Sequence, residues 1–298
     1  MKKSFAGRAI GLDTVFRAGL LAAACGLLMP ALAAEDAPPA RKALRVCQDP
    51  NNLPFSNAKG EGVENRIAEL FGKALGLPVT YYSFSQRAGS IAFLRNTLRF
   101  KLPDQDYPCD IVMSVPVGFD GIAVTKPYYR STYALVYAKG KGMDQVVTED
   151  DFLKLDPARL KSLRIGVYDR SPASAWLNRH GLVDQGVPFP IMNADPDQYP
   201  GQIIEKDLAA GKVDAVIVWG PIAGYFAHRV KTPSLAVVPL KSEKGVRLDY
   251  QMAMGVRYGE REWKQQIEGL IDSKSAEILA ILKDYGIPVV DASFEAPH

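Results

Sequence analysis

Histidine and cysteine are scarce in this chain, which limits the chemistry that it can perform. Among 298 residues there are three of each. The histidines, at positions 180, 228 and 298, are too far apart to form a ligand motif or a nucleophile–base motif. His180 ends a predicted helix before Gly181, where a positive charge would suit the helix dipole. We therefore predict no catalytic residue, no metal site and no cofactor.

Long apolar runs are also missing beyond the N-terminus. Four basic residues before position 18 precede an uncharged run over 18–33 that ends in Ala-Leu-Ala. This pattern predicts a secretory signal peptide over 1–33 and export to the periplasm, because a membrane span needs about 20 apolar residues. A lipoprotein signal ending at Cys25 is a weaker alternative, since Ala22 stands where a leucine is expected.

Neither sign of charge is in excess once that segment is set aside. It carries four of the 36 basic residues and one of the 33 acidic residues, which leaves 32 of each. The rest of the chain contains no basic run. Proteins that bind nucleic acids need a basic patch, so we exclude a nucleic acid as partner.

Two cysteines, Cys47 and Cys109, remain after the signal peptide. In an oxidising compartment a lone pair most simply forms a disulfide, here closing a loop of about 60 residues. Two buried free thiols are the alternative. Cys47 lies late in its predicted strand and Cys109 begins its own. This register is awkward for parallel neighbours, because bridged Cα atoms lie within about 7 Å.

Short apolar runs alternate with amphipathic segments along the chain. The first half predicts strands over 43–47, 78–85 and 109–115 and helices over 62–75 and 90–100. The order strand, helix, strand, helix, strand predicts an α/β protein with mainly parallel sheets flanked by helices.

The pattern then repeats in the second half. It predicts helices over 148–155, 174–182, 199–211, 262–273 and 275–286 and strands over 162–171, 189–193, 213–219 and 249–259. PCDIVMSVPVGF and KVDAVIVWGPIAGYF each place an Asp before an apolar strand that ends in a Pro/Gly loop. Two similar lobes in tandem would present their strand ends to one cleft, where α/β sheets bind ligands.

An acidic triplet, Glu149 to Asp151, could indicate a cation site. It follows Thr148, the predicted N-cap of a helix, and so occupies the first helical turn. Acidic side chains there complement the helix dipole, and we favour that interpretation over cation binding.

At a broader level the motifs resemble the two-lobed type II periplasmic solute-binding proteins. IAELFGKALGLPV, LRIGVYDRSPASAWL, GKVDAVIVWGPIAGYF and AEILAILKDYGIP occur in the order of that class. The resemblance implies lobe 1 over 42–138 and 249–298 and lobe 2 over 142–240. The chain would leave lobe 1 near 137–141 and return near 241–248.

A narrower resemblance rests on VCQDPNNLPFSN, SQRAGSIAFLRNTL, CDIVMSVPVGFDGIAVTKPYYRSTYALVY and YGIPVV. Together these are similar to the MxaJ/XoxJ proteins encoded beside PQQ-dependent methanol dehydrogenases. The resemblance implies a periplasmic role in maturing or activating that dehydrogenase, which is calcium-dependent in one branch and lanthanide-dependent in the other. We favour the lanthanide branch. The implied partners are the dehydrogenase and its cytochrome c.

Two departures from the amino-acid-binding members of the class support this interpretation. Those proteins usually carry a T-x-E-R segment after the lobe 1 strand, whose Arg binds an α-carboxylate in bidentate fashion. The corresponding VGFDGIAVTKPYY has no Arg before the Pro. Lobe 2 usually ends its last strand in Asp, whereas Trp219 and Gly220 stand here. We expect no tight binding of a free amino acid.

The candidate cleft and partner-binding residues follow the predicted strand ends and the crossing between lobes. They are Asp49, Asn51, Asn52, Phe55, Gln86, Arg87, Pro116, Phe119, Tyr128, Tyr129, Arg130, Tyr133, Asp169, Arg170, Ser171, Trp219 and Pro221. Their aromatic and Arg side chains suit a ligand cage and a protein-docking surface equally. The alternative is that half of them serve core or hinge packing.

Three functions remain in view. The favoured one is a non-enzymatic accessory protein that engages methanol dehydrogenase through the cleft. The second is a substrate-binding protein of an ABC transporter for a small, weakly charged solute. The third is a lyase- or dehydratase-type enzyme on the same fold. The small ligand, if the cleft takes one, is unknown.

Overall fold

The computed structural model describes residues 41–191 and 197–296. The predicted signal peptide over 1–33 and Cys25 lie outside the described residues. Residues 41–298 form one compact unit. Within the described ranges no helix is long and apolar enough to cross a membrane.

The elements alternate between strands and helices, as the sequence pattern predicts. The strands are β1 (Leu44–Gln48), β2 (Asn51–Asn52), β3 (Ser56–Asn57), β4 (Val79–Ser83), β5 (Ile111–Pro116), β6 (Ala123–Val124), β7 (Tyr129–Ala138), β8 (Ile165–Tyr168), β9 (Gly186–Phe189), β10 (Ala215–Trp219), β11 (Leu235–Pro239) and β12 (Asp249–Val256). The α-helices are α1 (Val63–Leu75), α2 (Ser90–Asn96), α3 (Glu149–Leu153), α4 (Pro157–Ser162), α5 (Pro172–Arg179), α6 (Gly220–Arg229), α7 (Arg261–Ser273) and α8 (Ser275–Asp284). Shorter helical segments are η1 (Gln86–Ala88), η2 (Val183–Gln185), η3 (Ile203–Leu208) and η4 (Ala292–Phe294).

Most predicted elements are confirmed, and three differ. The helix predicted over 90–100 ends at Asn96, because the hydroxyl of Thr97 bonds the carbonyl of Phe93 (2.7 Å) and competes with the backbone ladder. The strand predicted over 189–193 lies at Gly186–Phe189, and residues 192–196 fall outside the described part. The helix predicted over 199–211 is a π-helical segment over Ile203–Leu208.

Among the longer elements, α4 and β11 were not predicted; the two-residue strands β2, β3 and β6 and the segments η1, η2 and η4 were not predicted either. The signal for α4 is present in the sequence, since Pro157 occupies its first turn and the Asp156 carboxylate accepts hydrogen bonds from the N–H groups of Ala158 and Arg159. The helix is only six residues long and has no fully buried face, so apolar periodicity does not reveal it.

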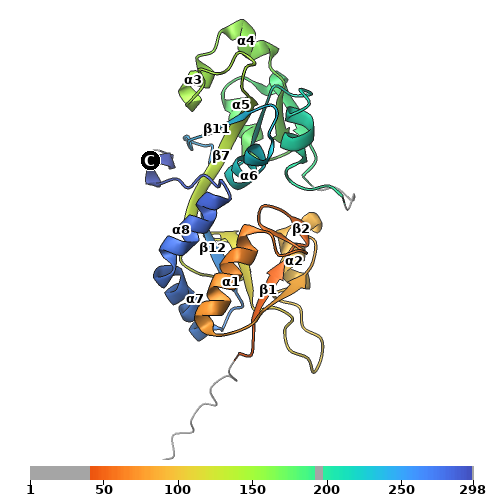
Figure 1. Ribbon diagram of the computed structural model, residues 1–298, viewed down its shortest axis with the longest axis vertical. Helices are drawn as coiled ribbons and strands as arrows, with labels where there is room; N and C mark the ends of the chain where they lie inside the picture. Colours follow the sequence, from red (N-terminus) through yellow and green to blue (C-terminus); the bar gives the residue numbers. More distant parts are fainter. Residues whose placement is uncertain (1–40, 192–196, 297–298) are drawn as a thin grey trace, which may run out of the picture. The chain divides into compact units, whose positions relative to one another are not determined.

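Eight strands form one continuous ladder in the order β4-β1-β5-β12-β7-β10-β8-β9, with β6 paired to β12 and β11 paired to β7, while β2 and β3 form a separate hairpin. The two ends of this ladder are parallel: β1 runs parallel to β4 and β5, and β8 runs parallel to β9 and β10. Antiparallel β12 and β7 join them. On the first sheet, helices α1, α7 and α8 contribute to one hydrophobic core with β1 and β12, and Figure 1 shows α8 next to both α1 and α7.

Strand β7 changes partners along its length. Its first part, Tyr129 to Thr132, pairs with β12, and its second part, Tyr133 to Ala138, pairs with β10 and β11. The predicted end of lobe 1 at residue 138 therefore lies several residues beyond the change of partners. A continuous strand carries the crossing, and the apolar run Ala134–Ala138 gives no sign of it in the sequence.

The Asp that precedes each central strand has the same partner in both halves. Asp110 binds Arg45 of the neighbouring strand β1 (Oδ2 to Nε, 2.6 Å), and Asp214 binds Arg164, which precedes β8 (Oδ2 to Nε, 3.1 Å). The backbone N–H of each Asp also donates to the carbonyl of that Arg, at 2.7 and 2.8 Å. The repeat seen in the sequence is thus an anchor at the amino end of the parallel strands, opposite the predicted cleft.

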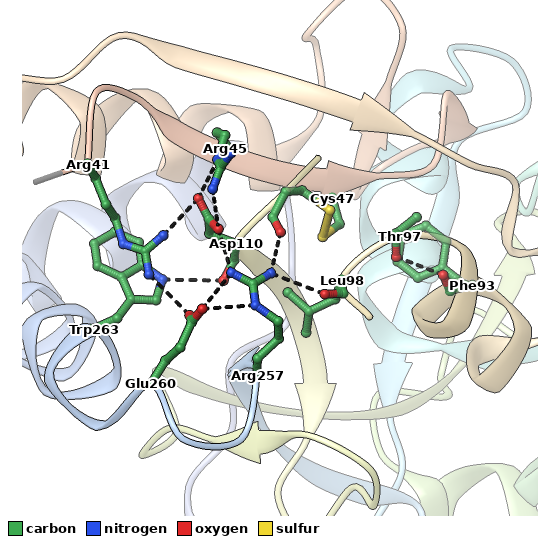
Figure 2. The surroundings of a disulfide bond; sticks show 11 residues. Arg41, Arg45, Cys47, Phe93, Thr97, Leu98, Asp110, Arg257, Glu260 and Trp263 are labelled. Carbon is green, nitrogen blue, oxygen red and sulfur yellow. Dashed lines mark hydrogen bonds and ion pairs between the residues drawn. A yellow bond between two sulfur atoms is a disulfide. The ribbon is translucent and has the colours of Figure 1, made fainter. Parts of the chain in front are cut away.

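The predicted disulfide joins Cys47 and Cys109, whose Cα atoms are 5.3 Å apart. In the ladder Cys47 lies opposite Val112 rather than Cys109. The bridge still forms because Cys109 precedes β5, which begins at Ile111, and is therefore free of the strand register. Figure 2 shows the bridge region beside the ionic cluster of Asp110.

Candidate functional site

Asp49 organises the loop that follows β1. Its buried carboxylate accepts hydrogen bonds from the backbone N–H groups of Asn51 (2.8 Å) and Gln86 (2.6 Å). These bonds tie the loop after β1 to η1, the segment that follows β4 and contains Gln86 and Arg87. Asp49, predicted as a cleft residue, therefore supports the loop from within.

The β2–β3 hairpin, in which Asn52 pairs with Ser56, reaches the core of the second half. Asn51 Nδ2 donates to the carbonyl of Gln198 (3.4 Å). Phe55 packs against two core clusters, one built on α1 and the other on η3 and α6. The odd polar loop after β1 thus contacts both halves of the ladder.

Gly62 shows how closely this hairpin packs on the start of α1. A Cβ atom at Gly62 would lie 2.0 Å from the carbonyl oxygen of Phe55, so only glycine fits. The N–H of Gly62 donates to Asn65 Oδ1 (3.0 Å), and Asn65 Nδ2 donates to Gln48 Oε1 (2.8 Å). The loop is therefore held by buried side-chain amides.

A buried acid lies next to this loop. Glu64, in the first turn of α1, is 7% exposed. Burial raises its pKa from the ordinary value of 4.5 to about 7, although a hydrogen bond with Ser114 opposes the rise and the charge of Asp49 adds to it. Ser114 has a left-handed backbone (φ 52°), and its hydroxyl lies 3.0 Å from that of Tyr128. Glu64 and Ser114 were not predicted as site residues.

Two buried side-chain oxygens have no hydrogen-bond partner among the described residues, Tyr129 OH and Ser171 Oγ. Both belong to the predicted site residues. A buried hydroxyl without a partner costs free energy, so such groups are uncommon and are often matched by a ligand or water. The two hydroxyls make these positions candidates for a contact with a bound molecule.

Three aromatic rings meet where β7, β10 and β12 adjoin. The Trp219 ring centroid lies 5.6 Å from that of Tyr133 and 5.7 Å from that of Tyr250. The guanidinium of Arg247 lies 4.6 Å from the Tyr250 centroid. Trp219 stands at the end of β10, the position at which amino-acid-binding members of the class usually have an Asp that binds the amino group. The position offers apolar and π surface and no anion.

An open pocket of about 570 Å³ lies beside these rings. It is lined by residues 89–91 at the start of α2, by residues 116–120 after β5, and by Arg247 and Tyr250. Pro116 and Phe119, both predicted, are among its walls. Ile91 and Val117 are 76% and 40% exposed, which is unusual for side chains of their size in one pocket. The pocket is mainly apolar, and its charged side chains are Asp120 and Arg247.

Arg130 lies away from any open surface. Its guanidinium binds Asp249 (Nη1 to Oδ2, 2.6 Å) and also pairs with Glu295, and its side chain is 11% exposed. The backbone carbonyl of Arg130 accepts from the N–H of Val290 (3.0 Å). Arg130 therefore fixes the C-terminal segment against β7, although it was predicted to contact a ligand or partner.

The second half contributes the loop after β8. Arg170 has a left-handed backbone (φ 54°), and its side chain is 85% exposed beside Asp169. Ser171 begins α5, whereas Pro221 is buried in the first turn of α6. Arg170 is thus available for contact and Pro221 serves packing. A role of the predicted residues in one shared cleft remains a prediction.

The residues missed by the sequence analysis share one property, which is that their neighbours come from distant segments. Glu64 borders the apolar stripe of α1, and this position is the sign in the sequence that its side chain is buried. Arg247 lies in the predicted return to lobe 1 near 241–248, where the sequence carries no motif, and Tyr250 lies in the strand predicted over 249–259.

Comparison with known proteins gives the family. No protein-family model matches the chain. The periplasmic binding protein XoxJ from Methylobacterium extorquens AM1 is 33% identical with a TM-score of 0.66, over 84% of this chain and all of that one. MxaJ from Methlophaga aminisulfidivorans MPT is 25% identical with a TM-score of 0.68, over 83% of this chain and all of that one.

A curated relative agrees with these structures. Protein MoxJ of Paracoccus denitrificans is 27% identical over 287 residues, which cover 92% of this chain and 97% of the relative. The similarity therefore extends through both halves of the ladder. The chain belongs to the XoxJ/MxaJ family of periplasmic binding proteins and has the α/β fold of the type II class.

Proposed function

We propose that the protein is a non-enzymatic periplasmic accessory protein that binds and activates or matures a PQQ-dependent methanol dehydrogenase. The observation that carries the proposal is the 33% identity to XoxJ over the whole of that chain. Identity to MxaJ is lower, at 25%. This difference supports our proposal that the dehydrogenase belongs to the lanthanide-dependent branch.

The pocket beside Tyr250 supports a docking role. Exposed Ile91 and Val117 offer apolar contact area, and Arg247 offers a cation at the edge. Aromatic and Arg side chains around an apolar centre are typical of protein-binding surfaces. We propose that the dehydrogenase, or a segment of it, contacts this pocket and the adjacent loops after β1 and β8. Its cytochrome c is a second candidate partner.

A small-solute receptor of an ABC transporter is the alternative function. The pocket volume of about 570 Å³ falls within the range of small-molecule sites. Against this, Trp219 replaces the expected acidic anchor and Arg130 is engaged with Asp249. A solute for this site would carry little charge.

A binding experiment separates the two functions. The purified protein is mixed with methanol dehydrogenase from the same periplasm, and complex formation is followed by analytical ultracentrifugation. We expect a complex with the dehydrogenase, whereas a solute receptor would form none. In parallel, calorimetric titration with small uncharged solutes should give no heat of binding.

A further inference from the structure

Three metal-ligating side chains meet in the second half of the protein, away from the pocket described above. They are Glu149 at the start of α3, His180 at the end of α5, and Glu243 in the loop between β11 and β12. One ligand atom of each lies within 4.8 Å of the other two. Ligand atoms at tetrahedral angles on one ion lie about 3.4 Å apart, since each bond is roughly 2.0–2.2 Å long, so a small inward movement of the three side chains would bring them to bonding distance of one ion.

The carboxylate of Glu149 is held in place by two donors. Trp176 Nε1 donates to Oε1 (2.6 Å), and the backbone N–H of Lys241 donates to Oε2 (2.9 Å). The Trp176 side chain is fully buried, so its indole is a fixed support. Donors of this kind orient metal-binding carboxylates in known sites.

The imidazole and the second carboxylate are also positioned. The His180 ring lies on Trp176 with centroids 4.5 Å apart, and its Nε2 is 2.8 Å from Glu243 Oε1. Glu243 sits in a tight turn whose backbone exchanges two 2.9 Å hydrogen bonds with Val246. The three ligands are thus presented by rigid segments and need little rearrangement to bind an ion.

The local charge favours a cation. The carboxylates of Glu149 and Glu243 each bring an oxygen to within 4.8 Å of the other. One cation, Arg179, pairs with this cluster, with its Nε 3.5 Å from Glu243 Oε2. Its side chain is 54% exposed, so it can move aside at low cost.

We propose that Glu149, His180 and Glu243 bind a divalent transition-metal ion, with Zn²⁺ as the best fit. One imidazole nitrogen and two carboxylate oxygens suit Zn²⁺, which takes four ligands and accepts water as the fourth. Calcium and the other hard cations prefer six or more oxygen ligands, so an imidazole makes the site a poor one for them. The bound ion would clamp α3, α5 and the loop after β11 together.

The sequence gives no sign of this site, because its ligands lie in three separate segments. His180 and Glu243 are 63 residues apart. The acidic triplet at 149–151 is divided in the structure: Asp151 caps α3, and only Glu149 turns toward the cluster.

Calorimetric titration of ZnCl₂ into the untagged, chelator-treated protein tests the proposal. We expect one Zn²⁺ per chain with a micromolar or tighter Kd, and a rise in Tm on binding. His180→Ala and Glu243→Gln should each weaken binding at least tenfold and remove the rise in Tm. His228→Ala removes an exposed histidine on α6 and should bind Zn²⁺ as the wild type does.

Other results would overturn the proposal. These are the absence of saturable Zn²⁺ binding, unchanged binding by Glu243→Gln, or an equal loss in His228→Ala. If His180→Ala does not fold, as circular dichroism would show, Glu243→Gln decides, because it keeps the shape of the side chain. Tighter binding of La³⁺ or Ca²⁺ than of Zn²⁺ would refute the assigned class of metal.

Discussion

The ring of Trp219 lies 5.6 Å from that of Tyr133, at the point where β10 meets β7. Both residues face the junction of the two halves, and Trp219 packs against a core cluster of each. An aromatic side chain thus occupies the position at which an amino-acid receptor needs an acidic anchor. The junction is built for contact with apolar or aromatic surface.

The first prediction follows from this pair. We expect no free amino acid to bind with a micromolar Kd. Position 219 is a Trp and offers no carboxylate to bind the amino group, and Arg130 is already paired with Asp249. Isothermal titration of the twenty amino acids provides the measurement. Micromolar binding of any of them would contradict the prediction, because this protein would then behave as an amino-acid receptor does.

The second prediction concerns Asp110, which is fully buried among Arg45, Arg257 and Arg41 (Figure 2). Asp110→Asn removes the negative charge and leaves buried Arg257 with only one of its two carboxylate partners, Glu260. We expect a loss of roughly 3 kcal/mol in the free energy of unfolding. Urea unfolding of both proteins at pH 7 measures it.

Asp214→Asn is the matched control, because it alters the equivalent pair of the second half. Asp214 and Arg164 are 29% and 52% exposed in their side chains, so the exchange should change stability little. Equal losses in the two variants would show that burial does not set the strength of this repeated pair.

The third prediction concerns how the stabilisation by Asp110 depends on pH. Burial alone would raise the pKa of Asp110, but hydrogen bonds from Arg45 and Arg257 outweigh burial and lower it. A lowered pKa in the folded state stabilises the protein above the ordinary carboxyl pKa, and this stabilisation disappears as the pH falls through the folded value. The stability difference between wild type and Asp110→Asn should therefore shrink in acid, as urea unfolding below pH 4 would show; a constant difference contradicts it.

The fourth prediction concerns Glu64, whose pKa rises from 4.5 to about 7 on burial. The folded state then holds the proton more tightly than the unfolded state, so wild-type stability falls as the pH rises through this window. Glu64→Gln has no such loss. From pH 4 to pH 8, the free energy of unfolding of Glu64→Gln should rise by about 3 kcal/mol relative to that of the wild type.

Urea unfolding at these two pH values checks the prediction for Glu64. Other titrating groups are common to both proteins and cancel in the comparison. A difference in stability that does not change with pH would mean that Glu64 is ionised in the folded state like an exposed acid.

The fifth prediction tests the docking pocket. Ile91→Asp and Val117→Asp place a charge in an apolar contact and should weaken binding of the dehydrogenase about tenfold or more. Both side chains are exposed in the free protein, so folding should be unaffected. Leu279→Asp, at a 46% exposed position on α8, is the control and should bind normally. Normal binding by both pocket variants would place the interface elsewhere.

Local patterns in the sequence predict the α/β architecture well. The apolar stripe of α1 and the continuous apolar run of β5 mark their elements without ambiguity. The Asp before each central strand was recognised as a repeat, but its role as a partner of Arg45 or Arg164 needed the register of parallel strands. Pairing between distant segments is not encoded in local periodicity.

The candidate site was harder to predict for the same reason. The position of Asp49 directly after a strand indicates an ordered polar loop. Whether its carboxylate faces inward or outward depends on the backbone of Gln86, which belongs to another loop. The change of partners at Tyr133 falls inside one continuous strand, in which Arg130, Ser131 and Thr132 precede it, an apolar run follows it and no turn residue marks the point. Glu64 and the Glu149–His180–Glu243 cluster depend on tertiary packing alone.

The most direct test is the activity of the dehydrogenase in cells that lack this protein. Methanol dehydrogenase is purified from the deletion strain, from the parent and from a strain carrying the gene on a plasmid, and its specific activity is measured with PQQ and lanthanide content recorded. We predict that the deletion strain yields an inactive or poorly active enzyme and that the plasmid restores it. Fully active dehydrogenase from the deletion strain would contradict the accessory function.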